Sequence, residues 1–176
     1  MEYVQIVASG GLDEFEIEDL LNSGAPIDAF GVGTKLGVSA DAPYLDMAYK
    51  MVSFGHRPVL KLSTGKLSLP GPKQIYRQCD ESGHFHHDVL AMREEVNEGE
   101  PLLVKVMENG RPLAPYPSLK TLRECFAEDF QRLPDAYRRL RKSPEYPVEI
   151  SRGLTELSRQ IGDHARLLSA EELGES

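Results

Sequence analysis

The sequence lacks most features of secreted, membrane-spanning or nucleic-acid-binding proteins. Its two cysteines lie far apart among 176 residues, which makes no disulfide framework and is typical of a reducing compartment. No apolar run approaches the roughly 18–20 residues of a membrane span, and the N-terminus has no signal-peptide pattern. Only 20 Lys and Arg stand against 28 Asp and Glu, so the chain lacks the net positive charge with which non-specific nucleic-acid binders attract polyphosphate. We therefore expect a cytoplasmic protein with no nucleic-acid or membrane partner.

What remains is typical of a globular protein of one ordinary domain or two small ones. Hydrophobic residues make up 40% of the chain and charged residues 27%, which leaves enough apolar surface for a core. A strand-like run begins directly after Met1 and Glu2. Domains rarely begin inside their own sheet, so we expect the chain to be a piece of a longer protein.

The first 45 residues predict a strand, a helix and a second strand. Tyr3–Ala8 and Ile27–Val32 are apolar and β-branched runs typical of strands covered on both faces. Between them, Asp13–Asn22 predicts an amphipathic helix with an acidic first turn. The unit is a βαβ crossover, so the two strands should be parallel.

The rest of the chain divides into two regions. Residues 46–116 contain short strand-like runs separated by Gly, Pro and Asn, which predict an antiparallel, β-rich region. Residues 117–176 are predominantly helical, with Ser118 as the first helix cap and a shorter helix over 135–143. An extended segment over 143–150 and a last helix from Ser151 to Ile161 complete the prediction.

Both predicted strands of the crossover end in glycine. The residues concerned are Ser9, Gly10, Gly11, Gly31, Val32, Gly33 and Thr34. The carboxyl ends of parallel strands meet at one edge, where glycine backbone amides can bind an anion and hydroxyls can complete its shell. We interpret them as a phosphate site; tight turns without a ligand are the alternative. A dinucleotide fingerprint is rejected, because Leu36 stands where the third glycine should be.

Other residues invite functional readings that the sequence does not favour. Cys79, His84, His86, His87 and Asp88 gather in "CDESGHFHHD", where an exposed hairpin is favoured over a zinc site. The basic run "YRRLRK" is better explained as a solvated helix face. Cys125 falls beside the apolar helix face, which favours a core position over a nucleophile. Around "LPGPKQIYR", the positive charges of Lys66, Lys73 and Arg77 face either the phosphate site or solvent.

Taken in order, several segments resemble nicotinate phosphoribosyltransferases. They include "SGGLDEFEI", "GAPIDAFGVGTKL", "SADAP", "YKMV", "LPGPKQIYR", "LAPYPSL" and "YRRLRKSPEYPVEIS", across roughly residues 5–160. The resemblance is to the C-terminal half of that family. It implies the last βαβ portion of an irregular α/β barrel, followed by a β-rich region and C-terminal helices, so that the barrel is incomplete.

The resemblance also implies chemistry. The family makes nicotinate mononucleotide from nicotinate and phosphoribosyl pyrophosphate, with Mg²⁺ and ATP, in NAD salvage. Its ribosyl phosphate would lie against Ser9–Gly11 and Gly31–Thr34, with Thr34 the first candidate ligand and with Lys35, Lys73 and Arg77 as candidate supporting cations. No catalytic residue and no metal ligand is expected in this chain, because the family's phosphorylated histidine and nicotinate-binding residues lie upstream.

Two departures from the family pattern bear on the site. "LDMAYK" replaces the family's "LGGVYK" at residues 45–50, and Gly11 stands where many members have Asp or Asn. We expect the isolated chain to be inactive and to work with the missing N-terminal half or a partner chain, in a homo-oligomer. A non-catalytic phosphate- or nucleotide-binding module, or a fragment that binds nothing, remains the alternative.

Overall fold

The computed structural model describes residues 3–44, 48–61 and 68–174, and these form two compact units. Unit 1 comprises residues 1–49 and unit 2 residues 50–176. Part of the "LDMAYK" departure (residues 45–47) and Lys66 lie outside the described residues. Among the residues that are described, no helix is both long and apolar enough to cross a membrane.

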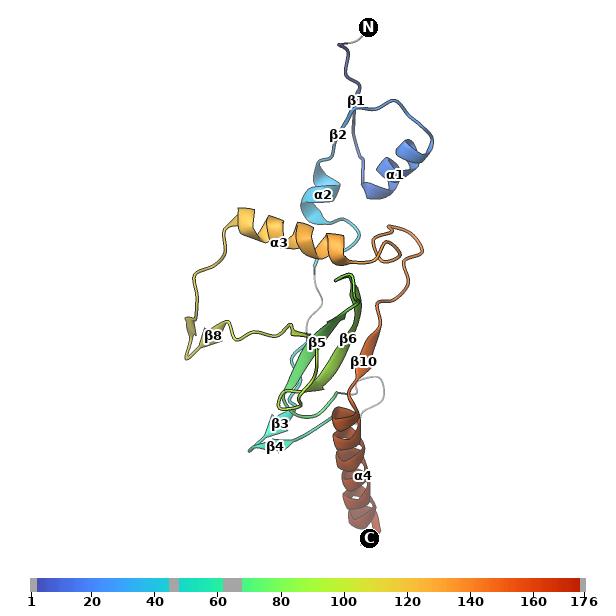
Figure 1. Ribbon diagram of the computed structural model, residues 1–176. Coiled ribbons are helices and arrows are strands. Elements are labelled where there is room, and N and C mark those ends of the chain that lie inside the picture. Colours follow the sequence, from blue (N-terminus) through green and yellow to red (C-terminus); the bar gives the residue numbers. More distant parts are fainter. Residues whose placement is uncertain (1–2, 45–47, 62–67, 175–176) are drawn as a thin grey trace. The chain divides into compact units, whose positions relative to one another are not determined.

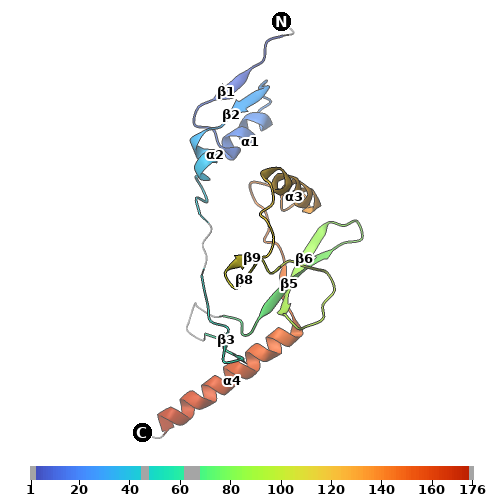
Figure 2. The same cartoon turned by 90° about the vertical axis from the view of Figure 1, so that its left-hand side faces the viewer.

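Unit 1 is a parallel βαβ crossover. It contains β1 (Val7–Ser9), α1 (Glu14–Asn22), β2 (Ala29–Gly31) and α2 (Thr34–Val38). The strands pair in parallel, as predicted, with Val7 opposite Ala29 and Ser9 opposite Gly31 (Figure 2). Their register is fixed at the entry to β2, where the Asp28 carboxylate accepts a hydrogen bond from the Ile6 backbone N–H at 2.7 Å.

Neither strand of unit 1 is covered on both faces, contrary to the prediction. The first strand begins at Val7 rather than Tyr3, and Tyr3 and Val7 are 96% and 63% exposed. None of the described residues in the range 3–49 is buried. Two three-residue strands and a nine-residue helix have too little surface to cover both faces of their own sheet.

Unit 2 is built on a long antiparallel hairpin. Its elements are β3 (Ser53–Phe54), β4 (Arg57–Pro58), β5 (Lys73–Cys79), β6 (Phe85–Met92), β7 (Glu100–Pro101), β8 (Met107–Glu108), β9 (Arg111–Pro112), α3 (Leu119–Arg132), β10 (Val148–Ile150) and α4 (Arg152–Gly174). The principal sheet has the order β10-β6-β5-β7, with β10 parallel to β6 (Figure 1). The sheet is therefore mixed rather than wholly antiparallel.

Unit 2 buries few apolar side chains, and they lie at opposite ends of β6. Ala91 and Leu154 are buried at the end next to α4, and Phe85 is buried at the end next to the hairpin turn. Ser151 lies between β10 and α4: its backbone N–H donates to Leu90 O, and its hydroxyl accepts from Leu154 N at 3.1 Å. This side-chain cap allows the chain to pass directly from strand to helix.

The helices after residue 117 agree with the sequence in part. Ser118 caps α3 as predicted, with its hydroxyl accepting from Thr121 N. The helix expected over 135–143 is wrong: the segment forms turns, and Lys142 has a φ of 58°, which a right-handed helix excludes. Cys125 is exposed, not in the core. The apolar side of α3 is open to solvent, with Phe126 69% exposed.

The mixed α/β class is confirmed. Within the part of the chain that the structure describes, the sheets close into no barrel, since β1 and β2 form a sheet of two strands. Their membership of a larger barrel stays a prediction.

Candidate functional site

The two glycine-rich strand ends of unit 1 line one cavity. It measures about 400 Å³ and is lined by Gly10, Gly11, Leu12, Gly31, Val32, Gly33, Thr34 and Lys35. We call it the strand-end cavity. Ser9 pairs with Gly31 at the last position of the strand pair, so both chains leave the sheet at the same level. The structure thus brings together the segments that the sequence selected.

Glycine is favoured at three positions in this cavity. Gly10 and Gly11 have φ values of +104° and +67°, a region that other L-residues rarely adopt. At Gly31, a Cβ would come within 3.1 Å of the Ser9 Cβ on the neighbouring strand. The backbone therefore turns sharply after β1 and passes close to its neighbour in β2, so that four glycines lie among the residues of the cavity wall.

The positive charge at this cavity belongs to Lys35, and it is already paired. Its Nζ lies 2.7 Å from Asp13 Oδ2 and 3.3 Å from Glu16 Oε2. The hydrogen bond between them raises the pKa of Lys35 and lowers that of Asp13. Lys35 also lines a neighbouring hollow of about 230 Å³ together with Asp13, Glu14 and Asp41. The surroundings of the strand-end cavity are therefore acidic beyond its backbone wall.

Sequence reasoning missed Asp13 and Glu16. Asp13 is the N-cap of α1: Glu16 N donates to Asp13 Oδ1 at 2.9 Å, and Asp13 N donates to Glu16 Oε2 at 3.2 Å. This reciprocal capping box has a local signature, an acidic cap followed three residues later by Glu, which was available in the sequence. The link to Lys35, 22 positions further along the chain, had no such signal.

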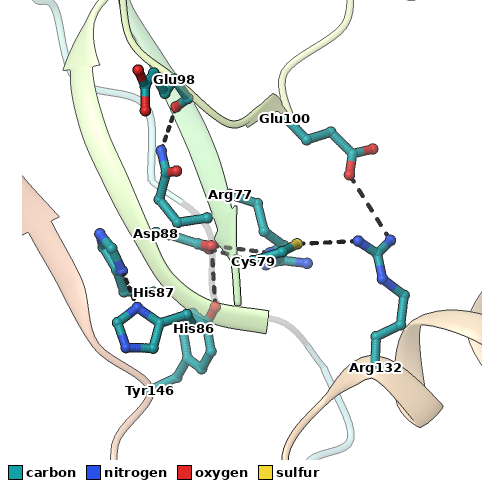
Figure 3. Close-up of polar contacts among 10 residues, drawn as sticks. Arg77, Cys79, His86, His87, Asp88, Glu98, Glu100, Arg132 and Tyr146 are labelled. Atoms are coloured by element: carbon teal, nitrogen blue, oxygen red, sulfur yellow. Dashed lines mark hydrogen bonds and ion pairs between the residues drawn. The ribbon is translucent and has the colours of Figure 1, made fainter. Parts of the chain in front are cut away.

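The other two candidate cations have partners within unit 2. Lys73 Nζ donates to the carbonyl oxygens of Leu69 and Gly71, at 2.7 and 2.6 Å, and partial burial lowers its pKa. Arg77 forms a two-pronged ion pair with Asp88, at 2.9 and 3.0 Å (Figure 3). Each side chain is thus held by its own unit, and a role of either at the phosphate stays a prediction.

The "CDESGHFHHD" segment is the predicted hairpin. Cys79 pairs opposite Phe85 at the end of β5–β6, and Asp80 closes the turn by accepting from the backbone N–H groups of Ser82 and His84. His86 and His87 contact each other through their Nδ1 atoms at 2.7 Å (Figure 3). Among the described residues, no group of three or more His, Cys, Asp or Glu has a metal-holding arrangement.

Unit 2 has a cavity of its own, of about 260 Å³. It lies between α3 and the hairpin and is lined by Arg77, Phe85, Phe126, Asp129, Phe130, Leu133 and Tyr146. Arg77 stacks on the buried Phe85 ring at 4.3 Å while it holds Asp88. Burial, together with the nearby Asp88 charge, raises the pKa of Tyr146 to about 12. A tyrosine that stays protonated and an arginine that is already neutralised make this a structural cluster rather than a reactive one.

Comparisons with known proteins agree on one family. A model of the nicotinate phosphoribosyltransferase C-terminal domain matches residues 96–158. Nicotinate phosphoribosyltransferase pncB2 of Mycobacterium tuberculosis is 42% identical over 173 residues, which cover 97% of this chain and 36% of that protein. The resemblance to nicotinate phosphoribosyltransferases is confirmed. The enzyme of that name from Bacillus subtilis is 29% identical over 84% of this chain and 36% of its own length.

A solved structure supports the same assignment. The crystal structure of human nicotinic acid phosphoribosyltransferase matches with a TM-score of 0.68 and 26% identity, over 91% of this chain and 33% of that one. The chain thus spans about a third of the length of the nicotinate phosphoribosyltransferases it matches. Both units take part in this similarity, because the aligned region covers nearly the whole chain.

Proposed function

We propose that this chain is the C-terminal portion of a nicotinate phosphoribosyltransferase and that it supplies the site for the ribosyl phosphate. In the proposed reaction, nicotinate and phosphoribosyl pyrophosphate give nicotinate mononucleotide and pyrophosphate in NAD salvage. One observation carries the proposal: two parallel strands, with Ser9 opposite Gly31, end at a single cavity that their glycine-rich loops line.

A backbone wall suits a phosphate for a physical reason. Main-chain N–H groups at successive positions can donate to several phosphate oxygens at once, and the absence of side chains at Gly10, Gly11 and Gly33 allows that approach. Thr34 adds a hydroxyl to the same lining. Since Lys35 already neutralises Asp13, we assign the main part of the binding to the amides and Thr34.

We infer that residues outside this chain hold the Mg²⁺ and ATP that the whole enzyme would use. Mg²⁺ prefers carboxylate and water ligands in octahedral geometry. The two carboxylates that contact the lining residue Lys35, Asp13 and Glu16, are bonded to it and to the start of α1. We therefore assign neither Mg²⁺ nor ATP to a residue of this chain, and we place the catalytic residues in the missing N-terminal half or a partner chain.

The same proposal implies where the chain acts and which partners it needs. We expect a cytoplasmic homo-oligomer once the remaining part of the enzyme is supplied, and no nicotinate mononucleotide formation by the 176 residues alone. Substantial turnover by the isolated chain would contradict this division of the site.

The test is to combine this chain with the remaining part of the enzyme and to vary Thr34. Thr34→Ala should raise the KM for phosphoribosyl pyrophosphate by about tenfold, the value of one hydrogen bond to a charged group, with little change for nicotinate. Thr34→Ser keeps the hydroxyl and should stay close to the parent. Equal losses for both substrates would remove Thr34 from the phosphate site. Binding of phosphoribosyl pyrophosphate without turnover in any combination would favour a non-catalytic binding module.

A further inference from the structure

Asp13, Glu16 and Lys35 form a closed ring of contacts beside the strand-end cavity. Asp13 Oδ1 accepts from Glu16 N at 2.9 Å, and Glu16 Oε2 accepts from Asp13 N at 3.2 Å. Lys35 Nζ then donates to the remaining oxygen of Asp13, at 2.7 Å, and to Glu16 Oε2, at 3.3 Å. The carboxylates therefore have two tasks, since the same pair begins α1 and holds a lysine from another segment.

The ring joins the two loops that make the cavity wall. Asp13 follows Gly10, Gly11 and Leu12, the wall segment after β1. Lys35 is the last residue of the wall segment after β2. Beyond the last paired residues, Ser9 and Gly31, the strand ladder no longer connects these loops. A tie between Asp13 and Lys35 restores a connection where the ladder ends.

We propose that Asp13 and Glu16 are positioning residues of the phosphate site. They hold the two glycine-rich loops in mutual register by binding Lys35 between them. This inference rests on the proposed function, because it concerns the same cavity. Asp13, at 22% side-chain exposure, is the less exposed carboxylate and makes the shorter bond to Lys35, so it should be the stronger of the two.

An alternative role of Lys35 predicts the opposite change in ligand affinity. If Lys35 contacts the phosphate directly, Asp13 and Glu16 compete with the ligand for the ammonium group. Removal of the Asp13 carboxylate would then free a cation and tighten binding. If the carboxylates position the wall, the same removal weakens binding. The direction of the change therefore decides between the two.

The test substitutes Asp13 in a way that separates its two tasks. Asp13→Ser keeps a good N-cap for Glu16 N, since Ser and Asp are about equal at that position, but removes the oxygen that holds Lys35. In the full chain, Asp13→Ser should raise the dissociation constant for ribose 5-phosphate by about fivefold, a typical effect for coupled neighbours. Lys35→Met should give a similar loss, and the double variant little more than either one.

A matched control removes an acidic charge without touching the ring. Glu14 begins α1 and lines the acidic hollow next to Lys35. Glu14→Gln should leave the dissociation constant within about twofold, since a single exposed charge contributes little. A gain in affinity for Asp13→Ser, or a loss for Glu14→Gln as large as that for Asp13→Ser, would overturn the positioning role.

A second measurement reports on the opening of the two loops that line the cavity and needs no ligand. Amide hydrogen exchange, followed by NMR, should be faster in Asp13→Ser than in the parent at residues 10–12 and 32–34, and unchanged in Glu14→Gln. Unchanged exchange in Asp13→Ser would overturn the inference whatever the ligand does. If exchange responds while ribose 5-phosphate fails to bind the parent chain, the proposed function falls and the positioning of the loops stands.

Discussion

In unit 1, a pair of three-residue parallel strands ends at an open cavity, whereas in unit 2 two long antiparallel strands carry a paired Arg77 and Asp88. The first has no buried residue among those described, and its cavity is lined by two glycine-rich loops. The second buries Phe85 and Asp88 and satisfies its polar groups with side chains. A binding site formed by backbone groups requires strand ends that no other element covers, whereas a core formed by side chains requires long strands. The two units therefore respond differently to substitution.

The largest expected effect is at the ion pair of unit 2. Arg77→Met should lower the free energy of unfolding by about 3 kcal/mol, because it leaves the buried Asp88 carboxylate without its cation. Urea unfolding measures the change. The double variant Arg77→Met/Asp88→Leu should recover much of the loss, since an apolar pair of similar volume carries no desolvation penalty. Equal instability of the single and double variants would contradict this explanation.

The second-largest effect is expected at Gly31 in unit 1, and it tests the contrast between the two units. Gly31→Ala should destabilise the strand pair by about 2 kcal/mol, because the new Cβ would lie 3.1 Å from the Ser9 Cβ. Amide exchange at β1 and β2 reports the change, and ribose 5-phosphate affinity should fall with it. The control is Gly37→Ala, whose Cβ meets nothing within 4 Å and which should stabilise α2 slightly. Tolerance of Gly31→Ala would show that the strands can separate without cost.

The third effect concerns the start of α4. Ser151→Ala should cost about 1 kcal/mol, because it removes the cap on Leu154 N. It also removes the 2.7 Å hydrogen bond that the hydroxyl donates to Glu95. Thermal unfolding measures the loss. Ser158→Ala removes a hydroxyl inside the same helix, bonded to Leu154 O, and should be neutral or slightly stabilising. Similar losses for both would exclude capping as the cause.

The smallest effect is the acid sensitivity of unit 1. Lys35 holds the pKa of Asp13 below its ordinary value of 3.8. A carboxyl group whose pKa is lower in the folded chain than in the unfolded chain stabilises the fold at a pH above its unfolded-state pKa. This stabilisation is lost as the pH falls through the folded-state pKa. Between pH 5 and pH 2.5, the protection factors of the β1 and β2 amides, corrected for the intrinsic exchange rate at each pH, should therefore fall more in the parent than in Asp13→Asn. Identical pH profiles would show that the Asp13–Lys35 bond does not contribute to stability.

Local signals accounted for the elements that they predicted. The caps at Ser118 and the parallel crossover follow from residue types within a few positions, and both are present. The helix predicted over 135–143 is wrong because the residue types in this segment do not determine the backbone conformation at its end. Lys142 takes a positive φ, and the Arg138 guanidinium lies over the Phe130 ring, at 5.8 Å. Cys125 was misplaced because an apolar helix face need not be covered within the same chain segment.

The sequence by itself determined the parallel crossover, its two glycine-rich ends and the resemblance to nicotinate phosphoribosyltransferases. The crossover and its glycine-rich ends depend on short segments, where steric limits and backbone preferences act directly, and the resemblance depends on the order of such segments along the chain. Only the tertiary structure decided that Lys35 binds Asp13 and Glu16, and that Arg77 binds Asp88 rather than standing free. Such pairings join residues 22 and 11 positions apart, and the choice among several possible partners depends on where the backbone brings each charge.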